Sequence, residues 1–539
     1  MDLICSGSTK LTTGRWKAFL IILAAWAIIY LPGLGRPGLK GEEGRRVLPA
    51  VEMLKTGNWV VPRIADQDYY NKPPGINWLI AASFALTGEQ SELTARLPSV
   101  IFVLIFVSLL IWIPVGWLNL EARIIAAIIY LTNIAIIEKG RLTEIESVYI
   151  ALTGIAILLW LNLWSRHGSR WLLWIPAGFV LGFGLLVKGP FILVFFYSVV
   201  ISVLWYEKKL KELVRIEHIV AIGIAGIITG SWVLMAFMQT NPTAMSSRMS
   251  SQLLIRIIGD LDILYWGQNV LREFEAFLPW LLFVPMLWNK SLTSRIAPQY
   301  QPLFHGSRLG MVIGFVIITL MPKMEARYTM PVIPLASILL GWLLSLHKEV
   351  VPTDRLWKNI LLVCFILSCL IAATGLIFVT RSPVTVIAFA ATIIATAFVI
   401  WKHNAIQGKL GLTLATMLLV MVLMLQHSTF FLDIAISKET RRPAAMTLNS
   451  IVPAGETINL FRPGSYIYPT IFRLRPPIRY ILDANDVNEQ VHYLVIKEDD
   501  LDGLKADKRI APGSDEELYE LSDEIPDEYR LVRLVHPRD

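Results

Sequence analysis

The segment Lys40–Trp78 carries a dense group of ionisable residues directly after the first long apolar run of the chain. Its candidate reactive residues are Glu42, Glu43, Arg45, Arg46 and Lys72. Carboxylates in the first turn of a helix often only complement the helix dipole. A lysine beside carboxylates can instead hold a phosphate, and here two prolines that follow Lys72 restrict its local backbone. The segment therefore predicts a general base and an anion-binding cation in one loop at a membrane surface.

Three later turns add ionisable residues that lie beside apolar runs. They are Lys139, Arg141, Glu144 and Glu146 in the first turn, Lys188 in the second, and Lys323, Glu325 and Arg327, followed by Tyr328, in the third. A tight turn can use such charges merely for solvation, but ionisable groups at membrane depth are functional candidates by default. Cations and carboxylates that alternate around one cavity would suit a bound phosphate beside a general base.

Other common catalytic patterns are missing from the sequence. The eight histidines are scattered without ligand spacing, and three cysteines permit neither a disulfide framework nor a zinc site. There is no Walker loop, no G-x-S-x-G element and no H-E-x-x-H element. ATP-driven transport, serine hydrolysis and zinc proteolysis therefore lose their usual support.

The composition indicates a protein that crosses a membrane many times. Of 539 residues, 55% are hydrophobic and 17% are charged, and the mean hydropathy is +0.57. A soluble globule carries about 25% charged residues. The net charge of +7 is best explained by lysines and arginines in cytoplasmic loops, so we expect the lipid bilayer as a partner and no nucleic acid.

Apolar runs predict about thirteen transmembrane helices, because a helical span needs about 20 mainly apolar residues. The runs are 16–34, 97–117, 123–138, 147–164, 171–187, 190–206, 218–238, 276–289, 309–321, 328–346, 358–379, 383–401 and 410–427. The first run resembles a signal peptide but lacks a small-residue cleavage site, so we expect an uncleaved helix.

The distribution of basic residues predicts the topology of these helices. With Lys10, Arg15 and Lys17 in the cytoplasm, the remaining cytoplasmic loops are rich in lysine and arginine, as the positive-inside rule requires. Two long loops, 35–96 and 239–274, then lie on the outer side. The apolar segment Ile76–Leu86 is too short to span, so we expect a helix in the membrane interface.

The last part of the chain predicts a separate small domain. Residues 428–539 are polar, and short β-rich runs alternate with turn signals and an acidic stretch typical of a helix. An odd number of helices places this domain on the outer side. We therefore expect a transmembrane domain over 1–427 and an α/β domain over 428–539.

An ordered set of short motifs resembles the GT-C glycosyltransferases that depend on polyprenyl phosphates, particularly bacterial aminoarabinose transferases of lipid A and protein mannosyltransferases. The motifs are Glu42-Glu43-Gly44-Arg45-Arg46, Glu52-Met53-Leu54, Gly57-Asn58-Trp59-Val60-Val61-Pro62-Arg63, Tyr70-Asn71-Lys72-Pro73-Pro74, Ala95-Arg96-Leu97-Pro98-Ser99, Arg141-Leu142 before Glu146, Lys188-Gly189-Pro190, Leu278-Pro279-Trp280 and Pro322-Lys323 before Tyr328. Each is weak alone, but their order over the first two-thirds of the chain is specific.

The resemblance implies an enzyme of the bacterial inner membrane with its active site on the periplasmic side. It would move a sugar from an undecaprenyl-phosphate-type donor to a lipid A-like or other envelope acceptor, with inversion. The implied catalytic carboxylates are Glu42, Glu146 and Glu43. The implied ligands of the donor phosphate are Lys72, Arg45, Lys188, Lys323 and Arg327, and the implied substrate pocket holds Tyr69, Tyr70, Arg63 and Tyr328.

Several departures from the family pattern bear on the substrate. Both acidic positions carry glutamate where the family usually has aspartate, Arg46 replaces a tyrosine, and Asn71 replaces an acidic residue. A protein or surface-glycan transferase of the same fold therefore stays open, as do a non-catalytic binder or flippase of lipid-linked sugars and a scaffold that recruits partners. The sequence makes no cofactor certain and leaves open a divalent metal ion shared by Glu42, Glu43 and Glu146.

Overall fold

The computed structural model describes residues 2–346, 352–378, 383–402, 408–432, 436, 439, 441–488, 490–507, 509–510, 514–521 and 529–534. The predicted cytoplasmic loops 347–358 and 402–409 lie partly outside these residues. The chain forms two compact units. The helical unit contains Met1–Leu34, Tyr70–Leu79 and Arg96–Leu432, and the sheet unit contains Gly35–Tyr69, Ile80–Ala95 and Asp433–Asp539. Most of the first long loop thus clusters with the C-terminal residues and not with the helices on either side of it.

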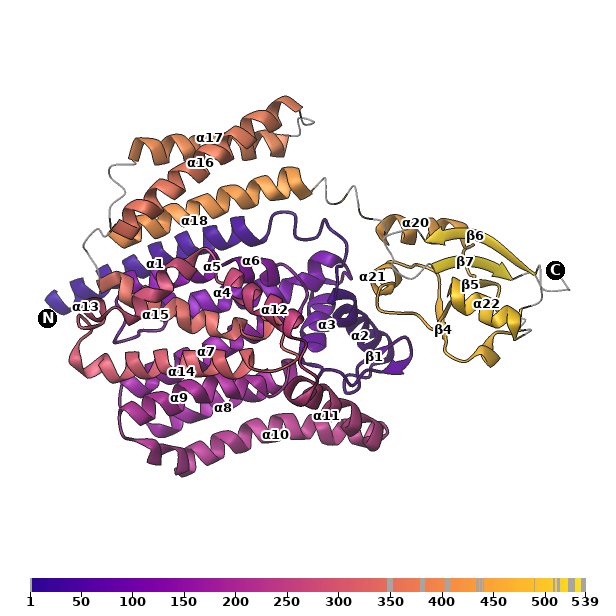
Figure 1. Cartoon of the computed structure of the whole chain (residues 1–539), viewed down its shortest axis with the longest axis horizontal. Helices are drawn as coiled ribbons and strands as arrows, with labels where there is room; N and C mark the ends of the chain where they lie inside the picture. Colours follow the sequence, from indigo (N-terminus) through magenta and orange to yellow (C-terminus); the bar gives the residue numbers. More distant parts are fainter. Residues whose placement is uncertain are drawn as a thin grey trace. The chain divides into compact units, whose positions relative to one another are not determined.

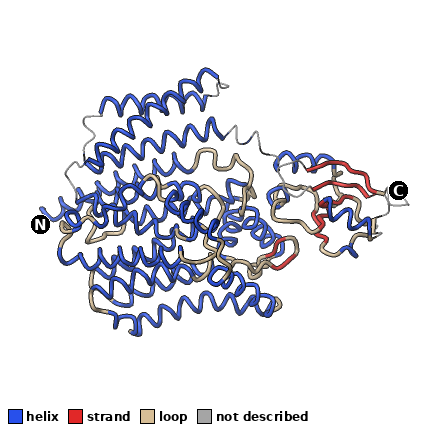
Figure 2. The backbone as a smooth tube through the Cα atoms, in the orientation of Figure 1, coloured by secondary structure: helices blue, strands red, loops and turns tan. Residues whose placement is uncertain are grey.

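Helices dominate the chain up to about residue 430 (Figures 1 and 2). They are α1 (Asp2–Tyr30), α2 (Glu43–Thr56), α3 (Gly75–Thr87), α4 (Glu92–Trp112), α5 (Leu120–Leu131), α6 (Ile134–Gly140), α7 (Ile145–Ser165), α8 (Arg170–Val187), α9 (Phe191–Tyr206), α10 (Ile216–Gln239), α11 (Pro242–Ile258), α12 (Ile263–Ala276), α13 (Lys290–Thr293), α14 (Gln301–Thr319), α15 (Ile333–Leu346), α16 (Pro352–Phe378), α17 (Pro383–Lys402) and α18 (Gly408–Gln426). Among the 3₁₀ helices that join the α-helices are η1 (Leu210–Val214) and η2 (Trp280–Trp288).

All thirteen predicted apolar runs coincide with helical segments. Among the described residues, nine helices are long and apolar enough to cross a membrane, or ten if α5 and α6 form one broken span. The run 123–138 differs from a single helix because α5 and α6 meet at an angle of 62°. Asn133 causes the break: its side chain accepts hydrogen bonds from the N–H groups of Ala135 and Ile136 and so starts a new helix.

Helices α7 and α15 form the interior of the helical unit, because 89% of the most apolar stretch of each membrane span is buried.

Glycines allow close helix packing elsewhere in this unit. A Cβ atom on Gly310 of α14 would lie 2.4 Å from the Cα atom of Val199 in α9, and one on Gly178 of α8 would lie 2.6 Å from the carbonyl oxygen of Ala221 in α10. Small residues at such crossings let backbones approach and gain packing energy without a hydrophobic driving force.

The sheet unit contains the predicted α/β domain. Its elements are α20 (Arg441–Ile451), β3 (Ile458–Phe461), α21 (Tyr468–Ile471), β4 (Ile478–Ile481), β5 (Tyr493–Lys497), α22 (Glu498–Ala506), β6 (Asp515–Leu521) and β7 (Tyr529–Leu534). The strand order is β4-β3-β5-β7-β6, with β3 parallel to β4 and β5 and with antiparallel pairs β5–β7 and β6–β7. Strand β6 was not predicted from the sequence, because its four acidic residues resemble a helical stretch.

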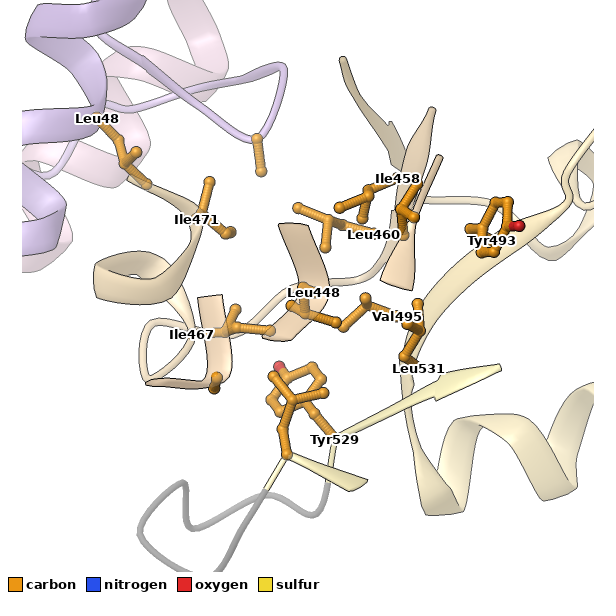
Figure 3. Packing of buried hydrophobic residues seen from close by; sticks show 14 of the residues in the cluster. Leu48, Leu448, Ile458, Leu460, Ile467, Ile471, Tyr493, Val495, Tyr529 and Leu531 are labelled. Atoms are coloured by element: carbon orange, nitrogen blue, oxygen red, sulfur yellow. The ribbon is translucent and has the colours of Figure 1, made fainter. Parts of the chain in front are cut away.

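One face of this sheet packs against the first long loop (Figure 3). Leu48 of α2 and Ile64 of the short hairpin β1 (Arg63–Ile64) and β2 (Gln67–Asp68) belong to the same buried cluster as Leu460 and Val495 of the sheet. Helix α2 also approaches α21 closely, because a Cβ atom on Gly44 would lie 2.8 Å from that of Tyr468. The C-terminal sheet therefore positions the loop that carries the paired carboxylates and guanidiniums.

Candidate active site

Three charged side chains from separate elements form a buried ion cluster in the helical unit: Glu146, Lys188 and Arg327. The Nζ atom of Lys188 lies 3.1 Å from Oε1 of Glu146, and the Nε atom of Arg327 lies 3.8 Å from the same oxygen. The side chains of Lys188 and Glu146 are only 4% and 6% exposed. Buried charges persist in proteins only when they are paired, so the cluster needs all its members to be stable.

Local sequence explains why the two partners meet at helix ends. Glu146 lies in the first turn of α7, where its negative charge complements the helix dipole, and Lys188 follows the last residue of α8, where a cation is favoured. Gly189 has a φ of 108°, which favours glycine, and Pro190 starts the next helix. The Lys188-Gly189-Pro190 turn therefore ends α8 and holds the lysine at the cluster.

Two tyrosine rings enclose the Lys188 ammonium. Its Nζ atom lies 4.8 Å from the ring centre of Tyr328 and 5.4 Å from that of Tyr149. A second cation, the guanidinium of Arg256, lies 4.8 Å from the Tyr328 ring centre. The Tyr328 hydroxyl donates a hydrogen bond to Glu325, which also binds Arg327 at 2.6 Å. Tyr328 thus contacts three cations: Arg256 of α11, Lys188 just after α8, and Arg327 in the loop before α15.

Burial shifts the pKa of two groups in this region. It lowers the pKa of Lys188, since desolvation disfavours the ammonium; Arg327 lowers it further, whereas Glu146 opposes the shift. Burial and the neighbouring Glu146 raise the pKa of Glu144. Glu144 is in turn bound by Lys139, whose Nζ atom lies 3.1 Å away. Both shifts disfavour the charged form of the group, which is the effect expected of burial.

The loop that carries Lys72 lies close to the end of α8. A Cβ atom on Gly75, three residues after Lys72, would lie 2.7 Å from the carbonyl oxygen of Leu186. Next to Lys72, the side chain of Asn71 accepts a hydrogen bond from Nε of Arg248 in α11 at 3.2 Å. Asn71, which stands where the resembled family usually has an acidic residue, therefore contacts α11 directly.

Helix α11 also approaches the loop before α15. A Cβ atom on Gly259 would lie 3.2 Å from Cγ of Lys323. The described part of the helical unit thus gathers the predicted residues of the Lys72 loop, the α7 and α8 ends and residues 323–328. The sequence analysis missed Arg256, Arg248 and Tyr149 as neighbours of this site. Arginines in the second long loop were a usable signal for the first two.

Not every charge predicted in these turns has a place in the cluster. The Arg141 guanidinium donates hydrogen bonds to the carbonyl oxygens of Ile29, Tyr30 and Pro32, at 2.7 to 3.0 Å. These carbonyls end α1, where four backbone acceptors lack intrahelical partners. Arg141 is therefore a helix-capping residue.

The predicted residues of the sheet unit form their own polar group around Glu42. The Glu42 carboxylate accepts one hydrogen bond from Arg45 at 2.8 Å and another from Arg46 at 3.1 Å. Arg46 also donates to the Tyr69 hydroxyl at 2.9 Å. The Glu42 side chain remains 28% exposed, so a substrate hydroxyl can still reach it. Arg46, which replaces the usual tyrosine, therefore fixes the orientation of Glu42.

Two other predicted residues of this unit have local partners. Glu43 is fully buried and accepts a hydrogen bond from the backbone N–H of Lys40 at 2.7 Å, which closes the turn before α2. Arg63 binds Asp68 at 2.9 Å across the β1–β2 hairpin. This geometry favours a capping role for Glu43 and a hairpin-stabilising role for Arg63.

The structure does not fit a metal ion shared by the three carboxylates. Both oxygens of Glu42 accept from arginines, Glu43 is buried at its turn, and Glu146 is paired with Lys188. No group of three or more histidine, cysteine, aspartate or glutamate residues in the described part of the chain could hold a metal ion. We therefore derive no chemical step through a metal.

Comparison with protein families and curated proteins supports the resemblance seen in the sequence. The family of dolichyl-phosphate-mannose-protein mannosyltransferases matches residues 71–234. An undecaprenyl phosphate-α-4-amino-4-deoxy-L-arabinose arabinosyl transferase of Pseudomonas fluorescens is 27% identical over 52% of this chain and 52% of its own length. One of Pectobacterium atrosepticum is 29% identical over 40% of this chain and 39% of its own length. The matched region thus spans about half the length of these relatives or less.

Solved structures extend the likeness over the whole chain. ArnT of Cupriavidus metallidurans bound to undecaprenyl phosphate superimposes with a TM-score of 0.71 at 18% identity, covering 97% of this chain and 99% of that one. Its apo form gives a TM-score of 0.66. The predicted fold class, a helical multi-pass membrane protein of the GT-C type with a C-terminal α/β domain, is therefore confirmed.

Proposed function

We propose that this protein is a membrane glycosyltransferase that moves a sugar from an undecaprenyl-phosphate-type donor to an envelope acceptor on the periplasmic side of the bacterial inner membrane. The buried ion cluster with its surrounding cations carries the proposal, because a lipid phosphate needs cations and a scaffold does not. The relatives named as arabinosyl transferases make 4-amino-4-deoxy-L-arabinose the first sugar to test. The resemblance seen in the sequence motifs makes a lipid A-like molecule the first acceptor to test.

The donor phosphate is the leaving group of this reaction. As the bond between the anomeric carbon and the phosphate oxygen breaks, negative charge develops on that oxygen and must be stabilised. We assign this role to Lys72, with Arg256 and Arg327 as further cations. Lys188 is paired with Glu146, which neutralises part of the charge that it could offer to the phosphate. Tyr328 orients these cations through its ring.

The acceptor needs a group that removes or orients its proton. We assign this role to Glu42, because it is a partly exposed carboxylate whose orientation is set by Arg45 and Arg46. The acceptor oxygen would attack the anomeric carbon, its proton would pass to Glu42, and undecaprenyl phosphate would leave with the bonding electron pair. A single displacement of this kind inverts the configuration at the anomeric carbon.

The direct test is transfer by purified protein. The full chain in detergent micelles is mixed with undecaprenyl phosphate-4-amino-4-deoxy-L-arabinose and lipid A. The products are separated, and their masses are measured by mass spectrometry. We expect lipid A to gain one aminoarabinose and undecaprenyl phosphate to appear in equal amount. A parallel incubation with EDTA shows whether a divalent ion contributes.

Mass spectrometry of lipid A, surface glycans and envelope proteins from cells with and without the protein tests the acceptor. A modified protein or glycan in place of lipid A would identify the related transferase activity. Donor binding without transfer to any of the three acceptor classes would refute the proposal and favour a binder or flippase of lipid-linked sugars.

A further inference from the structure

A cavity in the helical unit lies along α8, beside residues of that helix from Trp174 to Leu185. Its volume is about 450 Å³, within the range of about 300–1,000 Å³ usual for ligand pockets. Residues of α8, α9, η1 and α10 line it, among them Trp174, Tyr197, Leu213 and His218. Helix α10 packs along α8 (Figure 1), and the cavity occupies the space between α9 and α10. We call this cavity the α9–α10 groove.

The groove is apolar apart from a few donors at one end. Tyr197 and His218 face each other across it with 2.9 Å between the tyrosine hydroxyl and Nε2, and Nδ1 of His218 lies 2.6 Å from the Leu213 carbonyl oxygen. Since a carbonyl only accepts, Nδ1 donates to Leu213 and Nε2 accepts from Tyr197. Both histidine nitrogens are therefore satisfied, and this pair closes the groove without a ligand.

Trp174 is different. Its side chain lines the groove and contacts the His218 ring, with the ring centres 4.2 Å apart and the planes tilted by 45°. It is only 1% exposed, yet its indole N–H finds no hydrogen-bond acceptor among the described residues. A buried donor without a partner is costly, by more than the net gain of an average hydrogen bond. A ligand in the groove that brings an acceptor to Trp174 would remove this cost.

The end of the groove nearest Trp174 is basic. Between Glu207 and Arg215 the sequence has four basic and two acidic residues, and Arg170 starts α8 one turn before Trp174. Glu212 is bound by Arg170 at 2.8 Å and by Arg215 at 2.9 Å. Lys208 and Lys211 have no acidic partner among the described residues, so they leave an excess of positive charge.

We propose that the α9–α10 groove binds one anionic phospholipid. One acyl chain fills the apolar part, an ester carbonyl accepts the Trp174 N–H, and the phosphate lies near Lys208 and Lys211. With the predicted topology this is a lipid of the cytoplasmic leaflet, whose surface attracts basic segments.

The decisive variant fills the groove without disturbing the fold. Gly226 lines the groove, and a Cβ atom there would meet nothing within 4 Å, so Gly226→Phe has room to project into the cavity. Gly223 of the same helix also has open space around it but does not line the groove. Gly223→Phe is therefore the matched control, and Gly226→Leu serves if the phenylalanine variant does not fold.

Native mass spectrometry of the full chain, titrated with phosphatidylglycerol or phosphatidylcholine of the same acyl chains, measures the binding. We expect one phosphatidylglycerol per chain, retained about tenfold better than phosphatidylcholine. Gly226→Phe should lose the bound lipid and Gly223→Phe should keep it. Lys208→Ala combined with Lys211→Ala should remove the preference for phosphatidylglycerol, whereas Lys290→Ala on α13, whose side chain is exposed, should not.

The proposed hydrogen bond to Trp174 has a separate test. Diether phosphatidylglycerol lacks the ester carbonyl, so wild-type protein should bind it about fivefold less tightly than the diester form. Trp174→Phe should bind both forms equally. Equal binding of the two forms by wild-type protein would remove the assigned contact.

Three results would overturn the site itself. They are unchanged lipid retention in Gly226→Phe and Gly226→Leu, equal retention of the two headgroups, and displacement of phosphatidylglycerol by undecaprenyl phosphate at equal concentration. None of these measurements involves sugar transfer. The lipid site and the proposed transferase activity can therefore fail independently.

Discussion

Exchange of Lys188 for methionine tests the buried ion cluster most directly. The substitution keeps an unbranched side chain of similar length but removes the ammonium 3.1 Å from Glu146. Loss of one partner of a buried pair costs about 3–5 kcal/mol, because the other charge is left in a medium of low dielectric constant. Arg327 remains 3.8 Å from Glu146 and offsets part of this cost. We therefore expect the free energy of unfolding to fall by about 3 kcal/mol, at the lower end of this range.

The converse exchange, Glu146→Gln, should cost less. Lys188 then still has the faces of Tyr149 and Tyr328 beside it, and burial already lowers its pKa, so it can release its proton. We expect a loss of about 2 kcal/mol. The double variant removes both charges, and neutral groups of similar volume in place of a buried pair are often tolerated, so its loss should also be about 2 kcal/mol.

The assay is unfolding of the purified full chain in mixed detergent–dodecyl sulfate micelles, followed by circular dichroism. Lys290→Met on the exposed surface of α13 is the control for a lost lysine and should change nothing. The cycle should give a coupling energy of about 3 kcal/mol between Lys188 and Glu146. Losses that simply add in the double variant would refute the reasoning, because they would mean that the two groups are solvated and do not depend on each other.

Three further predictions address the proposed chemistry and the pH response. Glu42→Gln should abolish sugar transfer and leave donor binding and folding largely intact, since it keeps the hydrogen-bonding shape and removes the base; near-wild-type turnover would exclude Glu42 from that role. Lys72→Ala should weaken binding of undecaprenyl phosphate, measured by displacement of a fluorescent lipid phosphate, about tenfold or more, and an unchanged affinity would contradict its role at the phosphate. Burial raises the pKa of Glu273, which lines a cavity of about 160 Å³, to about 7. Since the unfolded chain loses this proton at lower pH than the folded one, stability should fall by about 2 kcal/mol between pH 5 and pH 8 and this fall should vanish in Glu273→Gln, whereas an equal fall in that variant would assign it to other groups.

Local patterns in the sequence were sufficient for the elements of the fold. Continuous apolar runs predicted the helices, since a backbone in lipid must satisfy its hydrogen bonds within the segment. Alternating β-rich runs predicted β3, β4, β5 and β7 of the C-terminal sheet. The acidic residues of β6 did not predict a strand. The segment forms a strand because the neighbouring strand β7 supplies the stabilising cross-strand contacts.

The motif order also located most residues of the candidate site. We could recognise two of its turns, Lys188-Gly189-Pro190 and the first turn of α7, from the sequence. The position of a helix end or of a glycine with positive φ is set by residues close to it in the chain. The roles of Glu42 and Lys72 remain predictions that the experiments above test.

Tertiary structure decided which charges meet. Glu146 and Lys188 are 42 residues apart, and only the packing of α7 against α8 brings them to 3.1 Å. Contacts between other elements bring Arg141 to the carbonyls that end α1 and Arg256 to the ring of Tyr328, although all these residues looked alike in the sequence. The type of a residue sets what chemistry it can perform, but the partner it finds depends on helix crossings between distant segments, which no local pattern specifies.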